Sequence, residues 1–367
     1  MERLETKRGR IDLPAFLPDA TRAAVRTLEA SELAAVGVQA LMVNVLHLST
    51  QPGVDVIRHL GGLNRFMAWP YPIASDSGGF QIFSLITENK KYGSISNQGF
   101  LYRPGGGKEK RLFTPEKSIK SQLELGADIL FCLDQCTHPE ASEEVQKESV
   151  DRTIKWARQC KDEFNRRTNN HEQRPLLFAV IQGGNNMDLR KRCVESLLEI
   201  GFDGFGFGGW PIDNEGRLVD MVAEAAELVP FGYPMHALGV GSPENILAAW
   251  EAGYTLFDST LPTRDARRRR LYITSGPLDQ SSVKDKNFYR YLYIEDKKYI
   301  RDSGPIDKNC SCPCCLKYSR GYLNHLFRAK EDLAPRLATL HNLTFYSKLM
   351  ETLAGVGEAG PKGSDKK

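Results

Sequence analysis

Eight short apolar runs recur along this chain, and each ends in a polar residue or a glycine pair. Runs without strict polar alternation are typical of parallel strands buried on both faces. Segments with helical patterns lie between them, so the sequence predicts an α/β fold, a (β/α)8 TIM barrel. The runs are PAFLP at 14–18, ALMVN ending at Asn44, PIASD ending at Asp76, DILFCLD ending at Asp134, LLFAVIQ ending at Gln182, GFGFGG ending at Gly209, HALGVG ending at Gly241 and TLFDST around Asp258.

Two of the intervening segments carry recognisable helix boundaries. Residues 114–126 start with Thr114 as the predicted N-cap, and residues 242–253 start with Ser242 in the same position. Both segments end in a glycine, which commonly terminates a helix. Residues 86–112 are a long connection rich in glycine and lysine, predicted as a hairpin or flap at the mouth of a pocket.

The strand ends predict that pocket, because the C-terminal ends of the strands in such a barrel converge on one face, where catalysis takes place. A barrel with only a structural role has no reason to end strand after strand in polar groups. The residues predicted to meet there, although far apart in sequence, are Asn44, Asp76, Asp134, Gln182, Gly209 and Asp258.

The overall composition is that of an ordinary globular protein. The 367 residues fit one barrel of about 250 residues with additions, and 41% hydrophobic with 26% charged residues exclude a disordered, collagen-like or coiled-coil chain. The net charge of +3 is too small to indicate a nucleic-acid partner, so any basic surface has to be local. No apolar run reaches the ~18 residues of a membrane span and no signal-peptide core precedes the first run, so we expect a cytoplasmic protein without a membrane partner.

The cysteines crowd into one short segment. Four of the eight lie between Cys310 and Cys315, a density that favours a metal site over a disulfide framework or metal-free thiols. Cys310, Cys312 and Cys315 form a C-x-C-x2-C motif, and His341 follows on a predicted helix. Three thiolates and one imidazole make a closed tetrahedral shell, so the motif predicts one structural zinc ion per chain.

Two other residues compete for places in this shell. Cys314 is a rival thiolate, and His325 is a rival fourth ligand. In either case the zinc would attach an insertion to the barrel. We therefore expect a barrel with the active site over residues 1–275, a zinc-binding C-terminal subdomain with closing helices over 276–350, and a disordered tail over 351–367.

The segment ASDSGGFQIFSL predicts a turn that contacts a ligand. Asp76 ends a strand, and Ser77, Gly78 and Gly79 let the backbone pass close to a bound molecule. Phe80 can then lay its ring against a planar heterocycle. The alternative interpretation is an aspartate N-cap followed by a tight turn without a ligand.

A local basic surface follows the last strand end. In TLFDSTLPTRDARRRRLYI, Asp258 is followed closely by five arginines within seven residues. Guanidinium groups suit phosphates and base edges. A solvated charge run is the ordinary interpretation, but this run leaves a candidate catalytic strand, so we favour nucleic-acid binding. The arginines are Arg264, Arg267, Arg268, Arg269 and Arg270.

Three further strand ends supply hydrogen-bonding groups for a base. Asp134, Gln182 and the pair Gly208 and Gly209 offer acceptors, an amide and backbone N–H groups, which together can read the Watson–Crick edge of a purine-like base. Each alone is weak, because a strand-ending Asp or Gln commonly caps a helix. The other chemistry-bearing residues are assigned to the core or its rim, namely His47, His236, Cys132, Cys160 and Cys193.

The order of these motifs resembles the tRNA-guanine transglycosylases. The resemblance rests on SDSGGFQ, the VIQGG strand end, FGGW after IGFDG, the LGVGSPEN loop, FDSTLPTR, and C-x-C-x2-C with a later His-Asn. It runs from about Pro14 to about Met350 and implies a barrel with a zinc-bearing insertion. That family exchanges guanine at the wobble position of certain tRNAs for a 7-deazaguanine. The resemblance therefore implies a pentosyltransferase of queuosine biosynthesis that needs no nucleotide cofactor.

The resemblance also implies roles by position. Asp258 would be the nucleophile that forms a covalent ribosyl intermediate, and Asp76 the general acid/base. Phe80 and Leu238 would sandwich the heterocycle, which has to leave its stack to enter the pocket. The other implied substrate contacts are Ser77, Gly78, Gly79, Asp134, Gln182, Gly208 and Gly209. The implied RNA contacts are Gly239, Gly241, Ser242, Asn245, Thr263, Arg264 and Arg267.

One segment departs from the family pattern. Trp210, Pro211 and Ile212 follow the glycine pair where bacterial relatives usually carry Leu, a small residue, and then Val or Gly. The segment lines the exocyclic substituent of the incoming base. A bulky Ile212, together with Cys136, argues against the cyclopentenyl group of queuine and for the smaller aminomethyl form, preQ1. The implied partners are the tRNA anticodon stem-loop, the 7-deazaguanine base and a second copy of the chain in a homodimer.

Three alternatives stay open. One is queuine-specific salvage by the same exchange. Another is a zinc-stabilised barrel hydrolase of free nucleosides or glycosides, which uses the paired carboxylates but gives the arginine run no role. The last is an RNA adaptor with a vestigial barrel, which predicts salt-dependent tRNA binding without turnover. We favour wobble-guanine exchange because the two aspartates, the arginine run and the zinc motif all fit it.

Overall fold

The structure is a computed structural model that describes residues 1–104, 107, 109–169, 173–285 and 287–357. Within these residues, none of the helices combines the length and apolar character needed to cross a lipid bilayer.

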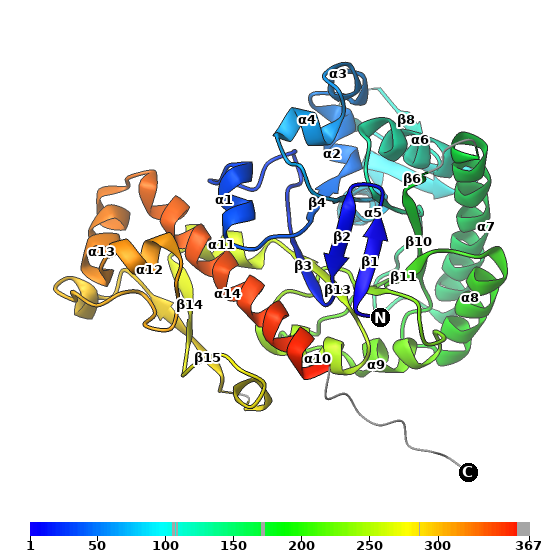
Figure 1. Ribbon diagram of the computed structural model, residues 1–367. Coiled ribbons are helices and arrows are strands. Elements are labelled where there is room, and N and C mark those ends of the chain that lie inside the picture. The colour runs from blue at the N-terminus through cyan, green and yellow to red at the C-terminus, as the bar shows by residue number, and fades with distance from the viewer. Residues whose placement is uncertain (105–106, 108, 170–172, 286, 358–367) are drawn as a thin grey trace, which may run out of the picture.

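The barrel prediction is confirmed, because all eight apolar runs form parallel strands of one sheet (Figure 1). The strands lie in the order β3, β13, β12, β11, β10, β9, β5 and β4. Four of them are shorter than expected, so Asp134, Gln182, Gly209 and Gly241 lie in the loops that follow their strands. The bounds are β3 (Ala15–Pro18), β4 (Leu41–Asn44), β5 (Ile73–Asp76), β9 (Ile129–Phe131), β10 (Leu176–Ile181), β11 (Gly204–Phe207), β12 (Met235–Ala237) and β13 (Leu256–Ser259).

The barrel closes between β3 and β4 through a short seam. A parallel bridge joins Asp19 to Met42, and the backbone N–H of Ala20 donates to the carbonyl of Met42 over 2.7 Å. At the opposite end, the hairpin of β1 (Arg3–Thr6) and β2 (Gly9–Asp12) contributes Leu4 and Ile11 to the core inside the barrel. The described strands therefore enclose a packed interior, plugged at the bottom and polar at the top.

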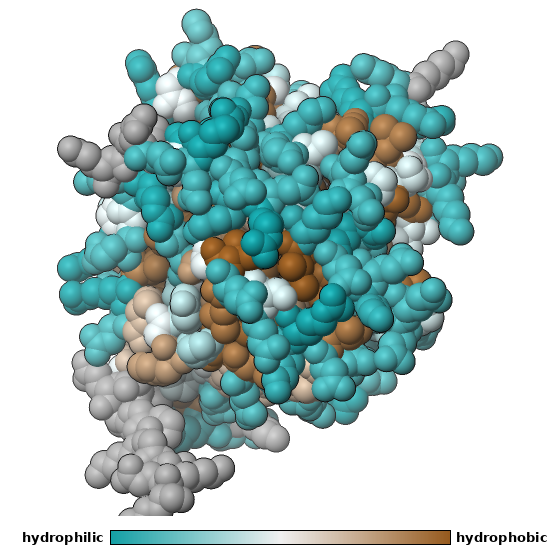
Figure 2. All heavy atoms as spheres, turned by 90° about the vertical axis from the view of Figure 1, so that its right-hand side faces the viewer, coloured by the Kyte–Doolittle hydropathy of each residue, from teal (hydrophilic) through white to brown (hydrophobic). Residues whose placement is uncertain are grey.

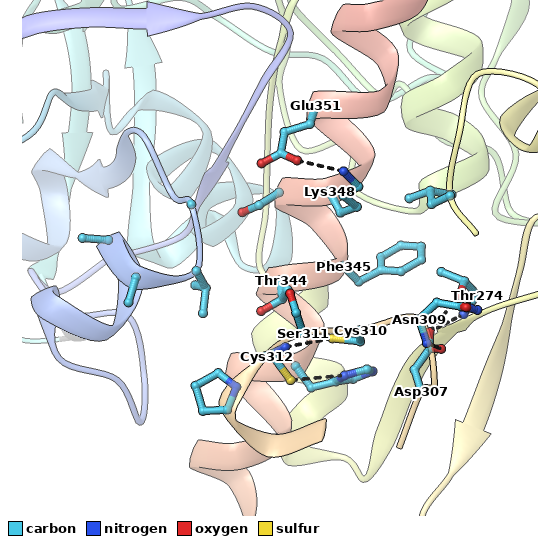
Figure 3. Close-up of a pocket in the computed structure, with 18 residues that line it drawn as sticks. Thr274, Asp307, Asn309, Cys310, Ser311, Cys312, Thr344, Phe345, Lys348 and Glu351 are labelled. Atoms are coloured by element: carbon cyan, nitrogen blue, oxygen red, sulfur yellow. Dashed lines mark hydrogen bonds and ion pairs between the residues drawn. The ribbon is translucent and has the colours of Figure 1, made fainter. Parts of the chain in front are cut away.

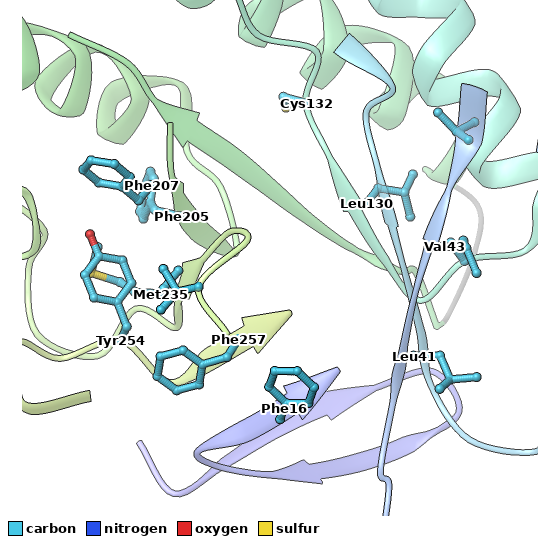
Figure 4. Packing of buried hydrophobic residues seen from close by; sticks show 14 of the residues in the cluster. Phe16, Leu41, Val43, Leu130, Cys132, Phe205, Phe207, Met235, Tyr254 and Phe257 are labelled. Carbon is cyan, nitrogen blue, oxygen red and sulfur yellow. The ribbon is translucent and has the colours of Figure 1, made fainter. Parts of the chain in front are cut away.

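Alternate residues of each strand separate the two faces of the barrel wall. Leu17, Met42 and Leu256 belong to the interior cluster. Their neighbours Phe16, Val43 and Phe257 face outward and pack under the surrounding helices (Figure 4). This alternation of direction fixes which residue at each strand end points into the mouth of the barrel.

Strand β11 shows why GFGFGG is not a uniform apolar run. Phe205 and Phe207 belong to the outer cluster, whereas the intervening glycines face the interior. A Cβ at Gly204 would lie 2.5 Å from the Phe178 ring, and one at Gly208 would lie 2.5 Å from Nε2 of Gln182. The glycines therefore make room inside the barrel for larger side chains from neighbouring strands.

Helices surround the barrel as predicted. Thr114 caps α6, its hydroxyl accepting from Lys117 N, and Gly126 follows the helix in a left-handed conformation. Ser242 is the N-cap of α10 as predicted, although its hydroxyl forms no hydrogen bond with a described residue. The bounds are α1 (Ala30–Ala35), α2 (Val45–Thr50), α3 (Val54–His59), α4 (Leu63–Met67), α5 (Gly79–Glu88), α6 (Pro115–Leu125), α7 (Glu143–Thr168), α8 (Met187–Ile200), α9 (Asp220–Glu227), α10 (Pro243–Glu251) and α11 (Leu261–Arg267).

The side of the molecule that carries α7 and α8 presents mainly hydrophilic side chains, with smaller apolar areas between them (Figure 2). The connection between α5 and α6 forms an antiparallel three-stranded sheet of β6 (Gly93–Ser96), β7 (Gly99–Tyr102) and β8 (Arg111–Phe113). Phe100 of this sheet packs on Trp156 of α7, with ring centroids 5.2 Å apart. The predicted hairpin is thus a small sheet anchored on α7.

The C-terminal part forms a second core beside the barrel. Its two-stranded sheet pairs β14 (Arg270–Thr274) with β15 (Tyr289–Tyr293), so the pairing spans the predicted boundary at residue 275. The following helices are α12 (Pro313–Lys317), α13 (Arg320–Ala329) and α14 (Leu333–Gly357). Helix α14 crosses the predicted boundary at 350, and residues 358–367 of the predicted tail lie outside the described residues. Short 3-10 helices are η1 (Lys90–Tyr92), η3 (Ser282–Lys284) and η4 (Lys297–Tyr299).

Candidate active site

Four consecutive strands each place one polar side chain at the top of the barrel. In the sheet register Asp258 lies opposite Leu17, Asn44 lies opposite Asp76, and Asp19 bridges to Met42. Leu17 and Met42 are interior residues, so the positions two residues further along their strands also point inward. Asp258, Asp19, Asn44 and Asp76 therefore line one arc of the barrel mouth.

Asp76 is held by neutral donors. Its carboxylate accepts from Nδ2 of Asn44 over 2.6 Å, from the backbone N–H of Val45 over 3.2 Å and from Nε2 of Gln81 over 3.3 Å. Burial and the charges of Asp258 and Asp19 outweigh these bonds and raise the pKa of Asp76 to about 7. A carboxyl group with such a pKa can give and take a proton at neutral pH.

Asp258 has one oxygen occupied and one available. Oδ1 lies 2.9 Å from Nε2 of His236 and accepts from the backbone N–H of Gly239 over 3.1 Å. Among the described residues, no group bonds to Oδ2. His236 is fully buried, and its Nδ1 has no partner among the described residues. Asp258 is therefore oriented through one oxygen, which leaves the other free to attack a bound molecule.

The predicted base-reading residues lie beside each other. Nε2 of Gln182 donates to Oδ2 of Asp134 over 2.7 Å. Burial raises the pKa of Asp134 to about 6, against the hydrogen bond from Gln182. Oε1 of Gln182 is buried without a partner among the described residues. Such an orphaned acceptor favours a ligand with N–H donors at this place.

The SDSGGF turn positions Phe80 at the rim. Gly78 has φ +78°, a left-handed conformation that favours glycine, and it begins α5. A Cβ on Gly79 would lie 3.1 Å from the carbonyl oxygen of Asp134, so this glycine allows a close approach of the two loops. The Phe80 ring is 44% exposed and lies edge-on to the ring of Trp210, with centroids 5.8 Å apart.

The loop after Gly209 is braced rather than open. Nε1 of Trp210 donates to the carbonyl of Thr137 over 3.0 Å, and Ile212 forms an antiparallel bridge with Leu218. The side chain of Asn245 holds the loop at both of its polar atoms, because Oδ1 accepts from Leu218 N and Nδ2 donates to the carbonyl of Gly216. Both polar atoms of the Asn245 side chain are therefore hydrogen-bonded to this loop. The contact of Asn245 with RNA stays a prediction.

The other predicted RNA contacts differ in exposure. Gly239 and Arg264 are exposed, Ser242 is half-buried, and Gly241 and Thr263 are buried. The Thr263 hydroxyl donates to Thr260 O over 3.1 Å, and its carbonyl accepts from Arg267 over 2.8 Å. Leu238 is half-buried on the interior side, against β11.

The arginine run divides into residues that form ion pairs and residues that do not. Arg270 pairs with the buried Asp265 over 2.8 Å and stacks on Tyr291, and Arg269 pairs with Glu295. Arg264, Arg267 and Arg268 form no ion pair with a described residue. Burial and the nearby charge of Arg26 lower the pKa of Arg267, which shows that like charges gather there. Three residues of the run are therefore available to an anionic partner.

The zinc ligands come together as predicted. The ligand atoms of Cys310, Cys312, Cys315 and His341 all lie within 4.8 Å of one another, and Nδ1 of His341 is 3.3 Å from Sγ of Cys315. Zinc bonds of about 2.3 Å to sulfur and 2.0 Å to nitrogen place neighbouring ligands at such separations. Nε2 of His341 is 2.7 Å from the carbonyl of Tyr272, which turns Nδ1 toward the thiols. These residues fit a structural zinc.

Neither rival ligand belongs to the cluster. Cys314 is fully buried in the second core, and His325 is exposed on α13. A cavity of about 450 Å³ lies beside the cluster, between α1, α14 and the cysteine segment (Figure 3). Its described lining includes Cys310, Cys312 and His341 but no residue of the predicted base pocket. The cavity is therefore separate from the barrel mouth.

The sequence interpretation missed three residues of the site. Asp19 follows the PAFLP run directly, so the rule that strands end in polar residues could have found it. His236 was assigned to the core, but it contacts Asp258. Arg190 carries a buried guanidinium that donates to the carbonyls of Ile181 and Gly184 at the end of β10, and no sequence signal marked it.

Comparison with known proteins agrees with this geometry. The family model of queuine tRNA-ribosyltransferase matches residues 1–354. A queuine tRNA-ribosyltransferase of Lysinibacillus sphaericus (strain C3-41) is 37% identical over 349 residues, 95% of this chain and 86% of that protein. One from Thermoanaerobacter sp. (strain X514) is 38% identical over 351 residues, covering 95% and 88%. One from Pseudoalteromonas translucida (strain TAC 125) is 36% identical over 360 residues, covering 98% and 89%.

The match spans both the barrel and the metal cluster. Identity of about 37% over nearly the whole of both chains, with a family model that ends close to the end of α14, leaves no part of the described site outside the alignment. The chain belongs to the queuine tRNA-ribosyltransferase family.

Proposed function

We propose that this protein replaces guanine at the wobble position of tRNA anticodons with a 7-deazaguanine, by double displacement through a covalent ribosyl intermediate on Asp258. The observation that carries the proposal is the pair of carboxylates at the barrel mouth. Asp258 has one oxygen oriented and one available, and Asp76 has a pKa of about 7. Two carboxylates in these two states are what a retaining glycosyl transfer needs.

In the first displacement, Oδ2 of Asp258 attacks C1′ of the ribose. The bond from C1′ to the base breaks, and its electron pair leaves with guanine, which takes up the proton of Asp76. His236 and the backbone N–H of Gly239 keep Asp258 in place through Oδ1. The ribose is then held as an ester of the enzyme, and Asp76 is ionised.

In the second displacement the incoming base gives its proton to Asp76 and attacks C1′, which releases Asp258. The acceptor has to be a base rather than water, so the closed pocket has to exclude water. Gln182 and Asp134 support recognition of either base, because the buried Oε1 of Gln182 needs a donor and the Asp134 carboxyl lies next to it. Guanine and 7-deazaguanines present the same N–H edge to these groups.

The favoured incoming base is preQ1. The wall that follows Gly209 is bulky and braced, with Trp210 bonded to Thr137 and Ile212 bridged to Leu218. A rigid wall of large side chains leaves less room for a cyclopentenyl group than for an aminomethyl group. Competition among preQ1, preQ0 and queuine for exchange into one transcript tests this preference, and preferred use of queuine would reverse it.

The partners of the reaction are the tRNA anticodon stem-loop and a second copy of the chain. Three arginines that follow β13 have no ion-pair partner among the described residues, namely Arg264, Arg267 and Arg268. Their guanidinium groups suit the phosphates beside the flipped base. The homodimer is a family expectation. Sedimentation at micromolar concentration tests it, and a monomer at all concentrations would remove it.

Trapping the intermediate tests the proposed function. Wild-type protein mixed with an anticodon stem-loop transcript and 9-deazaguanine should give a slow-migrating adduct on a denaturing gel, and labelled guanine should exchange into the transcript. Asp258→Asn should abolish both, whereas the exposed Asp12→Asn, a matched change outside the barrel mouth, should leave both unchanged. Exchange at the wild-type rate in Asp258→Asn would remove the nucleophile assignment.

A further inference from the structure

A third carboxylate lies between the two that the proposed mechanism uses. Asp19 follows β3, and β3 lies between β13, which carries Asp258, and β4, which adjoins β5 and its Asp76. Asp19 points inward because it is two residues beyond Leu17, an interior residue. The nucleophile, this carboxylate and the general acid therefore follow one another around the barrel mouth.

Burial raises the pKa of Asp19, and hydrogen bonds from Thr21 oppose that rise. Both oxygens accept from the Thr21 hydroxyl, over 2.5 and 2.7 Å, and Oδ1 also accepts from the Thr21 backbone N–H over 3.2 Å. Hydrogen bonds of this kind stabilise a carboxylate over a carboxylic acid. Asp76 differs, because its position is more buried and two negative groups act on it.

The charged groups around Asp19 come from several elements. On one side lie the carboxyl groups of Asp258 on β13, whose charge acts on Asp19, and of Asp76 on β5. On the other side, His47 of α2 and Arg267 of α11 both interact with Asp19, and Arg22 of the loop after β3 acts on His47. Asp19 thus faces the Arg267 guanidinium and the His47 imidazole, whose pKa is lowered by burial, on one side and the catalytic pair on the other.

We propose that Asp19 is a positioning residue whose negative charge keeps the Asp76 carboxyl protonated in the free enzyme, ready to protonate the departing guanine. This inference rests on the proposed function, because it concerns the acid of that reaction. Burial disfavours the ionised form of Asp76, and the charges of Asp258 and Asp19 add to this effect, so Asp76 retains its proton near neutral pH. Thr21 and Arg267 favour charge on Asp19 rather than on Asp76.

The test is the pH dependence of adduct formation. Single-turnover rates of the covalent complex are measured from pH 5.5 to 9 with the anticodon stem-loop, for wild type, Asp19→Asn and the control Asp12→Asn. Removing the charge of Asp19 should let Asp76 ionise at lower pH. In the plot of rate against pH, the fall in rate at high pH should therefore occur about half a unit or more lower for Asp19→Asn than for wild type. Relative to wild type, the rate of this variant should be about threefold lower at pH 8 and little changed at pH 5.5. Asp12→Asn should follow wild type.

A second variant covers the case in which Asp19→Asn does not fold. Thr21→Val keeps the shape of the side chain but removes the hydroxyl that holds the charge on Asp19, and it should move the fall in rate at high pH in the same direction by a smaller amount. Superimposable profiles, or an equal loss of rate at every pH, would overturn the inference while leaving the proposed function intact. A wild-type protein that forms no adduct at any pH would overturn the proposed function itself.

Discussion

Asp76 and Asp134 are chemically identical carboxyl groups at the barrel mouth, yet their surroundings give them different tasks. Burial and two neighbouring carboxylates raise the pKa of Asp76 to about 7, while burial alone, opposed by the Gln182 amide, raises the pKa of Asp134 to about 6. A group that titrates at neutral pH suits proton transfer. A carboxylate bonded to an amide suits recognition of a base edge.

The raised pKa of Asp76 has a consequence for stability. Since the folded state binds the proton more tightly than the unfolded chain, the contribution of Asp76 to stability falls as pH rises from about 4 to about 7. Asp76→Asn removes this cost, so we expect it to stabilise the protein by about 1–2 kcal/mol more at pH 8 than at pH 5.5. Urea unfolding of the variant, with Asp12→Asn as control, measures the difference. Equal effects at the two pH values would contradict the assigned titration.

Single residues could be predicted where one strand end carries one polar side chain. Asp76, Asp258 and Gln182 were found in this way, and they lie at the barrel mouth. The role of His236 was missed. Nothing in HALGVG distinguishes a histidine that only fills the core from one that orients a carboxylate on the next strand. Asn245 was assigned to RNA, whereas the structure shows its amide bonded to the loop around Gly216, a long-range contact that spacing does not reveal.

At the scale of elements, β11 illustrates how a barrel interior limits side-chain size. Gly204 faces inward, where a Cβ would approach the Phe178 ring to 2.5 Å. Phe178 is fully buried. Glycine is therefore the residue that lets the bulky ring occupy the interior at this level.

Gly204→Ala should accordingly destabilise the protein by about 1–3 kcal/mol through overpacking. Gly276→Ala is the matched control, because a Cβ there meets nothing within 4 Å, and we expect it to change stability by less than about 0.5 kcal/mol. Thermal unfolding of both variants makes the comparison. A Gly204→Ala protein as stable as the control would show that the interior can expand.

The arginines after β13 should respond to substitution in two different ways, according to whether they form an ion pair. Arg264→Gln removes an exposed cation, so stem-loop binding should weaken and the slope of log K against log salt should fall by about 0.7–0.9. Arg270→Gln should keep that slope but lose about 2 kcal/mol or more of stability, because it leaves the buried Asp265 unpaired. Binding titrations at several salt concentrations and urea unfolding distinguish the two. Identical behaviour of both variants would refute the division.

The types of the elements were predictable because the hydrophobic pattern and the residues that end helices and strands are local features of the sequence. All eight strands appear where the apolar runs lie. Their exact ends were not predictable. Strand β9 stops at Phe131, and the residues that follow are held by contacts with α7, such as Leu133 N with Cys160 and Gln135 N with Thr153. The five arginines form one run in sequence, but only the fold separates those that form ion pairs.

At the scale of the whole molecule, the zinc cluster joins segments that are distant in sequence. Cys312 begins α12, and His341 lies in the middle of α14. Cys312→Ser should lose the zinc and lower the melting temperature, whereas Cys314→Ala and His325→Gln should keep one zinc per chain, because neither residue belongs to the cluster. Metal analysis of the purified variants, followed by thermal melts, measures this. Equal zinc content in Cys312→Ser and wild type would contradict the ligand set.

Helix α14 reaches back to the beginning of the chain. Tyr346 packs on Phe16 of β3 with ring centroids 4.6 Å apart, and the same helix contacts α1 and α11. A ribosome releases residues in order, so the first barrel strand leaves the exit tunnel long before the helix that covers its outer side. During that interval Phe16 has no cover from α14, and nascent chains are open to chaperone capture or to pairing with one another. Burial of Phe16 therefore waits until α14 has been synthesised.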